Sequence, residues 1–176
     1  MTCVNLNSAR VGLLAAAATT TLLATAPSYA LSARHDGARL PAGITTGTCT
    51  SGASAYSVST DLQTTTSRKY RDVTGTSVAF TQGASGCVEV SFSGEGATTP
   101  GEILVTQAVI DGSAVCLPGD NLFASDSPSS DLADHAMNYI CPNVGAGNHT
   151  AKIQFRSRFG GKVALDYRTT IVRYTP

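Results

Sequence analysis

Residues 148–174 read NHTAKIQFRSRFGGKVALDYRTTIVRY, and this stretch decides the fold class of the chain. Apolar residues stand at every second position in both halves: Ala151, Ile153 and Phe155, then Val163, Leu165 and Tyr167. Alternation with a period of two is typical of a β-strand with one buried face and one solvent-facing face. The stretch therefore predicts two long antiparallel strands joined by a tight turn at Gly160-Gly161.

Face parity limits the register of this expected hairpin, because side chains directly opposite each other in an antiparallel pair point to the same side. A two-residue loop at the glycine pair would set an apolar residue opposite a charged one, whereas an odd-length loop keeps the buried faces together. The favoured register pairs Phe155 with Tyr167 and Arg156 with Asp166, because the other odd register sets two cations opposite each other.

Shorter strand patterns recur along the middle of the chain between turn-forming clusters. They cover residues 56–59, 78–81, 88–93, 102–111 and 113–117. Residues 102–111 are apolar on both faces, which predicts a central strand, and Asp111-Gly112 is a hairpin signal. The segment 132–140 fits either a short helix or a strand. Together these patterns predict an all-β fold, an antiparallel β-sandwich. The long strands and the late long hairpin favour a jelly roll over an immunoglobulin topology, and the chain has no tryptophan, the buried hallmark of antibody domains.

The first 30 residues have the organisation of a secretory signal peptide. Arg10 supplies the positive region, Val11 to Thr25 the apolar region, and Ser28-Tyr29-Ala30 the small residues at a cleavage site after Ala30. We therefore expect export, with no stable membrane insertion once the signal is removed. Residues 31–54 lack periodicity and are interpreted as a flexible arm, and residues 55–176 as the β-sandwich domain.

Composition and cysteine count bound the function further. The chain has 12 basic and 12 acidic residues, which gives no general attraction to nucleic acid or anionic membranes. Without Cys3, which lies in the signal, four cysteines remain, and an even count in an exported chain predicts two disulfides. We expect Cys49–Cys87, tying the arm to a strand, and Cys116–Cys141, clasping one long loop.

Several segments carry a family resemblance: GCVEVSFSGE (86–95), AVIDG (108–112), AGNHTAKIQFRS (146–157), GGKV (160–163) and RTTIVRY (168–174). Their combination resembles a set of exported bacterial β-sandwich proteins. More distantly, the strand rhythm is similar to that of jelly rolls of the C1q/tumour-necrosis-factor type. That second resemblance implies a protein that acts by binding and assembles as a trimer.

The loop between Cys116 and Cys141 offers a candidate calcium site. Four carboxylates fall within it: Asp120, Asp126, Asp131 and Asp134. Calcium takes six to eight oxygen ligands, often from one acidic loop, although no EF-hand spacing is present. The alternative is a solvated polar loop in which Asp131 caps a short helix beginning at Leu132.

The terminal stretch offers a candidate ligand-binding face. In the favoured register Lys152, Arg156 and Arg168 share one face, which is suited to an anionic glycan through charge-assisted hydrogen bonds. The alternative is a solvated sheet face on which Asp166 pairs with Arg156. In the favoured register Phe155 and Tyr167 lie on the other face, so no aromatic residue stands between these cations on theirs, which argues against nucleic acid.

These observations predict a non-catalytic binding or assembly module. One alternative is a self-associating structural surface protein, with a trimer as the expected assembly. Another is a secreted hydrolase using Asp residues and His135 of the 117–141 loop, although the chain has neither a G-x-S-x-G nor an HExxH motif. Convergence of His135 with two loop carboxylates in one cleft would favour the hydrolase.

Overall fold

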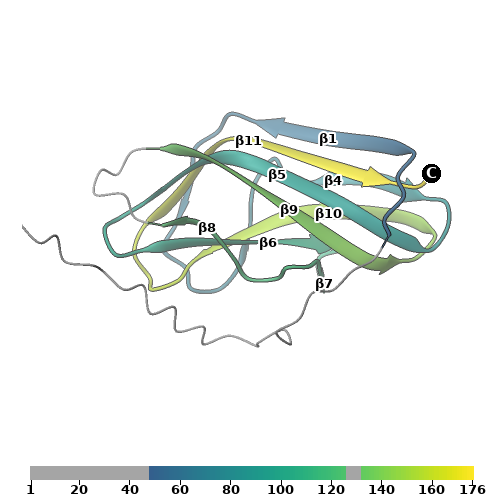
Figure 1. Cartoon of the computed structure of the whole chain (residues 1–176). Coiled ribbons are helices and arrows are strands. Elements are labelled where there is room, and N and C mark those ends of the chain that lie inside the picture. Colours follow the sequence, from purple (N-terminus) through teal and green to yellow (C-terminus); the bar gives the residue numbers. More distant parts are fainter. Residues whose placement is uncertain (1–47, 126–131) are drawn as a thin grey trace, which may run out of the picture. The chain divides into compact units, whose positions relative to one another are not determined.

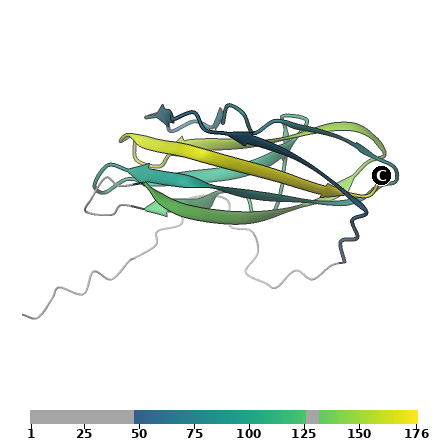
Figure 2. The same ribbon diagram turned by 90° about the horizontal axis from the view of Figure 1, so that it is seen from above.

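The computed structural model describes residues 48–125 and 132–176, and all their regular structure is extended (Figure 1). A five-stranded sheet has the order β1-β11-β5-β9, with β2 also paired to β11. Its strands are β1 (Ala53–Ser59), β2 (Gln63–Thr65), β5 (Gly86–Thr98), β9 (Ala133–Val144) and β11 (Val163–Tyr174). Figure 2 shows β11, β5 and β9 running side by side.

A six-stranded sheet has the order β3-β10-β6-β7, with β4 also paired to β10 and β8 to β6. Its strands are β3 (Arg71–Asp72), β4 (Val78–Gln82), β6 (Ile103–Ile110), β7 (Ala114–Val115), β8 (Asn121–Ser125) and β10 (Gly147–Ser157). All pairings in both sheets are antiparallel. The predicted all-β antiparallel sandwich is therefore confirmed, while the jelly-roll topology stays a prediction.

The terminal stretch does not form the hairpin that its sequence predicts. The strands β10 and β11 are long, as expected, but they belong to different sheets. Phe155 lies opposite Thr106 of β6, so the predicted pairs of Phe155 with Tyr167 and Arg156 with Asp166 are wrong. Alternation shows which face of a strand is buried but not which strand lies beside it. Here the buried faces of β10 and β11 meet across the core.

A bulge in β11 adds a second departure. The register with β5 shifts between Asp166 and Thr169, and Tyr167 has a φ of 40°. Tyr167 is consequently 61% exposed, whereas the side chain of Arg168 is turned inward and fully buried. The Arg168 guanidinium donates to the Leu165 carbonyl at 2.8 Å and to the Ser59 hydroxyl at 3.0 Å. A bulge shifts the alternation by one residue, and the sequence pattern does not announce it.

Strand β6 is central in its sheet, as predicted, and is buried on both faces. It continues through Asp111 and Gly112, with φ angles of 51° and 77°, into β7, which confirms the predicted hairpin. Between the sheets, the hydroxyl groups of Tyr139 on β9 and Thr106 on β6 are hydrogen-bonded at 2.6 Å. Burial raises the pKa of Tyr139 to about 12. This buried bond connects the two layers through the core.

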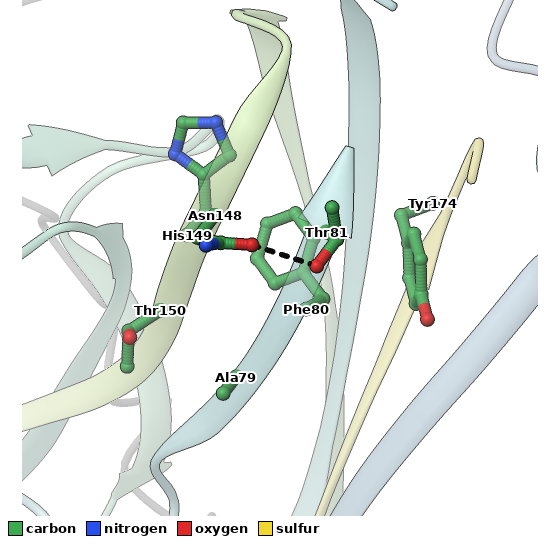
Figure 3. A pocket seen from close by; sticks show the side chains of 7 residues that line it. All are labelled: Ala79, Phe80, Thr81, Asn148, His149, Thr150 and Tyr174. Atoms are coloured by element: carbon green, nitrogen blue, oxygen red, sulfur yellow. Dashed lines mark hydrogen bonds between the residues drawn. The ribbon is translucent and has the colours of Figure 1, made fainter. Parts of the chain in front are cut away.

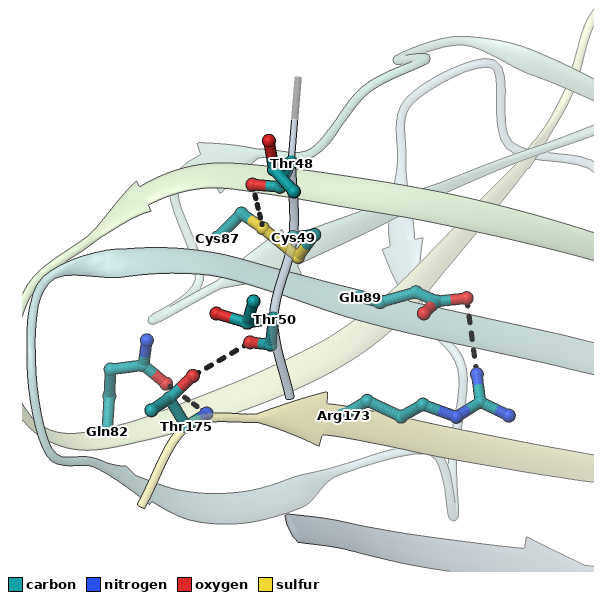
Figure 4. Close-up of a disulfide and its surroundings, with 8 residues drawn as sticks. All are labelled: Thr48, Cys49, Thr50, Gln82, Cys87, Glu89, Arg173 and Thr175. Carbon is teal, nitrogen blue, oxygen red and sulfur yellow. Dashed lines mark hydrogen bonds and ion pairs between the residues drawn. A yellow bond between two sulfur atoms is a disulfide. The ribbon is translucent and has the colours of Figure 1, made fainter. Parts of the chain in front are cut away.

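Both predicted disulfides are present. Cys49–Cys87 ties the segment before β1 to β5, and Figure 4 shows the nearby hydrogen bond from the Thr175 hydroxyl to the Thr50 carbonyl. Cys116–Cys141 joins the residue after β7 to β9, and so links the two sheets.

The predicted long loop between Cys116 and Cys141 is largely strand, because β8 and much of β9 lie within it. The segment 132–140, for which the sequence fits either a helix or a strand, belongs to β9 from Ala133 onward. It is therefore a strand, and no helix begins at Leu132. Asp131, the expected helix cap, lies outside the described residues.

At the N-terminal side, β1 begins at Ala53, so residues 53 and 54 of the predicted arm belong to a sheet. The signal peptide predicted at 1–30 and the arm up to residue 47 lie outside the described residues. Within the part of the chain that the structure describes, no helix is long and apolar enough to cross a membrane.

Candidate functional site

The outer face of the six-stranded sheet carries a row of polar side chains. On β10, Lys152, Gln154 and Arg156 alternate with core residues and therefore point away from the sandwich. They lie opposite Val109, Gln107 and Val105 of β6, respectively. We call this surface the polar face; it consists of Tyr70, Asp72, Gln107, Asp120, Lys152, Gln154 and Arg156.

At one end of the polar face, Arg156 makes a two-pronged contact with Asp120. Its Nη2 atom lies 2.7 and 2.9 Å from the two carboxylate oxygens, and its Nε lies 3.2 Å from Oδ1. The Tyr70 hydroxyl donates a short hydrogen bond to the same carboxylate. The Arg156 guanidinium also lies over the Tyr70 ring, 5.3 Å from its centroid. Such multiple contacts fix the orientation of all three groups.

Electrostatics fixes the protonation states of this cluster. Burial works against the charge of Asp120, but the hydrogen bonds from Tyr70 and Arg156 hold the pKa of its carboxyl below the ordinary value. Burial, together with the bond to Asp120, raises the pKa of Tyr70. Asp120 is therefore an acceptor and Tyr70 a donor across the physiological pH range. The Asp120 side chain remains 49% exposed, which leaves it accessible to a ligand.

A second polar group lies one step along β10. Gln107 donates to the Gln154 amide oxygen at 2.8 Å, and Gln154 donates to Asp72 at 2.8 Å. The Lys152 ammonium lies 3.3 Å from the other oxygen of Asp72. Hydrogen bonds from Gln154, and the nearby Lys152, hold the pKa of Asp72 below its ordinary value.

Beneath these groups lies an apolar layer on the same outer side. Val105 and Val109 are buried even though their register places them on the outer face. They lie directly opposite Arg156 and Lys152, and long cationic side chains of this kind cover apolar surface with their aliphatic stems.

The structure brings only some of the sequence-predicted ligand-binding residues together. Lys152 and Arg156 share the polar face, but Arg168 is buried on the five-stranded sheet, so the predicted three-residue face does not form. Arg156 pairs with Asp120 rather than with Asp166. The anionic-ligand role of Lys152 and Arg156 stays a prediction.

Of the predicted calcium ligands, the two that the structure describes lie at different sheets. Asp120 is engaged in the polar face, and Asp134 lies opposite Glu95 on the five-stranded sheet. Asp126 and Asp131 lie outside the described residues. Within residues 48–125 and 132–176, no group of three or more His, Cys, Asp or Glu side chains is placed to hold a metal ion. The calcium site stays a prediction.

The histidines are placed as follows. His135 is half-buried and its ring packs against Phe123 at 5.3 Å, whereas its neighbour Asp134 is exposed. His149 lies at the far end of β10, where Nδ1 contacts Asp111 at 2.8 Å and Nε2 contacts the Gly145 carbonyl at 3.0 Å. Both partners are acceptors, so this geometry requires a protonated ring, and the hydrogen bond to Asp111 raises the pKa of His149.

His149 also borders a shallow depression of about 400 Å³ (Figure 3). Its lining comes from β4, β10 and the end of β11: Ala79, Phe80, Thr81, Asn148, His149, Thr150 and Tyr174. The Thr81 hydroxyl donates to the Asn148 amide oxygen at 2.8 Å across it. Because both ring nitrogens of His149 are engaged, the depression offers no free base.

Sequence reasoning missed Tyr70, Asp72 and Gln107. It also missed Gln154, although the alternation of Gln154 in phase with Lys152 and Arg156 could have placed it on the same face. Tyr70 and Asp72 fall in the segment SRKYRD (67–72), which has no alternation to assign it to a sheet. Its pairing with β10 becomes visible only in the fold.

No family model and no curated protein sequence matches the chain. Among solved structures, it is similar to a carbohydrate-binding module of Cellvibrio mixtus lichenase 5A in complex with cellotriose. That likeness has a TM-score of 0.36 and 16% identity, over 72% of this chain and 100% of that one.

Two further structures show comparable likeness. Dimeric latent PorU from Porphyromonas gingivalis has a TM-score of 0.38 and 15% identity, over 70% of this chain and 14% of that one. A family two carbohydrate esterase from Cellvibrio japonicus has a TM-score of 0.26 and 15% identity, over 70% and 35%. At these scores the likenesses carry no argument about function.

Proposed function

We propose that the protein is an exported, non-catalytic binding module whose polar face binds a glycan. One observation carries the proposal. The Arg156–Asp120–Tyr70 cluster and the Gln107–Gln154–Asp72–Lys152 group form a continuous row of oriented donors and acceptors on one sheet face.

Sugar hydroxyls both donate and accept hydrogen bonds, and planar carboxylate, amide and guanidinium groups can each engage two of them. The Asp72 and Asp120 side chains are about half exposed, so each keeps acceptor sites open to a ligand. Their positions are already fixed by protein partners, which lowers the entropic cost of binding.

Charge pairing favours hydroxyl groups as the recognised feature. Arg156 is balanced by Asp120, and Lys152 by Asp72. A neutral glycan therefore meets a balanced surface, whereas an anionic glycan must compete with both carboxylates. The proposal of export is based on the signal peptide predicted at residues 1–30. It agrees with the two disulfides, which are typical of oxidising compartments.

The direct test is affinity electrophoresis of the disulfide-intact protein through gels containing soluble neutral polysaccharides (xylan, glucomannan, mixed-linkage glucan) or acidic ones (polygalacturonate). We expect retardation by a neutral polymer, with little dependence on salt. Retardation only by the acidic polymer, abolished by salt, would support the anionic-glycan alternative. Mobility unchanged in every gel would contradict glycan binding.

The matched variants are Arg156→Lys, which keeps the charge but loses the two-pronged geometry, and Tyr56→Ala on the opposite sheet. We expect Arg156→Lys to weaken retardation at least tenfold and Tyr56→Ala to leave it unchanged. Release of reducing ends from the bound polymer, lost in His135→Ala, would replace this proposal with the hydrolase. Light scattering that finds a trimer without glycan binding would favour the self-associating structural protein.

A further inference from the structure

The connection from β10 to β11 is built around the carboxylate of Glu102, which is 2% exposed. Its Oε1 accepts hydrogen bonds from the backbone N–H groups of Arg158 and Phe159, each at 2.9 Å, and from that of Ile103 at 2.8 Å. Its other oxygen accepts one from Gly161. Burial works against the charge, but the bonds from Phe159 and Ile103 hold the pKa of Glu102 below its ordinary value.

Other groups restrain the same connection. The Arg68 guanidinium donates to the Phe159 carbonyl at 2.5 and 3.0 Å, and the Gly160 N–H donates to the Ser157 hydroxyl at 2.7 Å. Gly160 has a φ of 101°, in the left-handed region that favours glycine. A Cβ at Gly161 would lie 2.8 Å from the Glu102 carboxylate, which is too close without a shift. The backbone of this connection is therefore restrained by hydrogen bonds to Glu102, Arg68 and Ser157.

The side chain that this restrained backbone presents is Phe159. This residue is 54% exposed, although exposing a phenyl group to water is unfavourable. The Arg158 guanidinium lies 5.8 Å from the centroid of the ring. A rigid backbone that holds an apolar ring in solvent is the arrangement of a preorganised contact group.

The connection adjoins the polar face. Arg158 directly follows the last residue of β10, Ser157, and its charge contributes to lowering the pKa of Asp120. Arg158 thus contacts the Phe159 ring and lies close enough to the Arg156–Asp120 cluster to act on the charge of Asp120. A ligand lying along β10 would meet hydrogen-bonding groups first and an aromatic ring at the end.

We propose that Phe159 is the stacking platform of the glycan site, and that Glu102 and Arg68 are its positioning residues. This inference rests on the proposed function. The apolar C–H face of a pyranose would lie on the ring, while its hydroxyls reach the polar face. A flat C–H face is largest in β-linked pyranoses whose hydroxyls are all equatorial, so the ligand class is a glucan or xylan chain of that kind.

The chain contains no tryptophan, so Phe159→Trp would introduce a single tryptophan at the platform, which can be excited selectively in the presence of the tyrosines. Tyr56→Trp, at an exposed position on the five-stranded sheet, is the matched control. Each variant and the wild type would be titrated with cellohexaose and with xylohexaose, by fluorescence and by calorimetry. We expect a saturable blue shift in Phe159→Trp only. Phe159→Ala should bind at least tenfold more weakly than wild type, with an unchanged melting temperature.

The outcomes separate the two proposals. Suppose that wild type binds a hexaose and that Arg156→Lys weakens this binding. If Phe159→Ala then binds like wild type and Phe159→Trp shows no fluorescence shift, the stacking role of Phe159 is refuted, while the polar face remains the binding site. If the shift appears in Tyr56→Trp instead, both are overturned. No binding of either hexaose by wild type overturns the ligand class inferred here, and retardation by the polysaccharides then decides the proposed function separately.

Glu102→Gln tests the positioning role. An amide keeps one acceptor oxygen but loses the charge that holds the backbone donors. In the Phe159→Trp background we expect faster loss of fluorescence anisotropy and at least fivefold weaker hexaose binding. An unchanged anisotropy decay would show that Glu102 does not position the ring.

Discussion

The two outer faces of the sandwich use their exposed side chains differently. On the six-stranded sheet, Arg156 and Gln154 each bond to a carboxylate brought from another part of the chain. On the five-stranded sheet, a polar cluster is present, in which Arg173 donates to Glu89 at 3.2 Å and to Ser91 at 3.1 Å. Tyr56 and Tyr167 are exposed there, and no side-chain hydrogen bond engages their hydroxyl groups among the described residues. The six-stranded sheet carries two adjacent clusters of oriented polar groups along one strand, which prepares it for an extended ligand, whereas single exposed rings are ordinary on protein surfaces.

The largest effect should come from removing the cross-link between the two sheets. We expect Cys116→Ala/Cys141→Ala to lower the free energy of unfolding by about 2–4 kcal/mol. The matched control is Cys49→Ala/Cys87→Ala. If chain entropy alone decided, removing Cys49–Cys87 would lower the free energy of unfolding more, because this disulfide spans 38 residues and Cys116–Cys141 spans 25. Since Cys116 and Cys141 are buried in the core, we expect the opposite order in urea unfolding.

Tyr139→Phe removes the buried hydroxyl that reaches from the five-stranded sheet to Thr106 on the six-stranded sheet. We expect a loss of about 1–2 kcal/mol, because the Thr106 hydroxyl is left buried without its partner. Tyr56→Phe is the control on the outer side of the same sheet, with an expected change within about 0.5 kcal/mol. Equal effects in the two variants, measured by urea unfolding, would refute the inter-sheet role of this bond.

Acid should weaken the six-stranded sheet through Asp72 and Asp120, whose pKa values are both lowered in the folded protein. A depressed carboxyl pKa contributes stability that is fully present above the unfolded value, about 3.9, and is lost as the pH falls through the folded value. We expect Asp120→Asn to reduce stability by up to about 1 kcal/mol at pH 6, because the side chain is half exposed. The deficit should shrink toward pH 2, and a deficit independent of pH would contradict this account.

The smallest effect should come from His149. Its pKa is raised by Asp111, so its contribution is present below the unfolded value, about 6.5, and is lost as the pH rises through the folded value. We expect His149→Gln to be less stable than wild type at pH 5 and nearly equal to it at pH 9, by thermal unfolding. The opposite order would show that the neutral ring is the stabilising form.

Alternation and cysteine count predicted much of this fold. They identified β10 as a strand with Lys152 and Arg156 outward, and both disulfide pairs. They failed where the prediction depended on which strands lie next to each other. The burial pattern of β10 and β11 is the same whether the strands are neighbours or face each other across a core, and the bulge at Tyr167 inverted the side assigned to Arg168.

Only part of the candidate site could be predicted from the sequence, for the same reason. Arg156 and Lys152 could be placed on one face, but their carboxylate partners come from segments without strand periodicity. Asp120 was assigned to a calcium loop and Asp72 to no site. Glu102 gave no local signal either, because its backbone partners at 158–161 are far away in the sequence.

The most direct measurement is a ¹H–¹⁵N NMR titration of the disulfide-intact protein with the glycan that retards it most strongly. We expect saturable shifts in amides of β10, β3 and the connection at 158–161, and none along β1. Shifts concentrated around Tyr56 on β1, or an unchanged spectrum at saturating glycan, would contradict the claim that the six-stranded sheet carries the binding site.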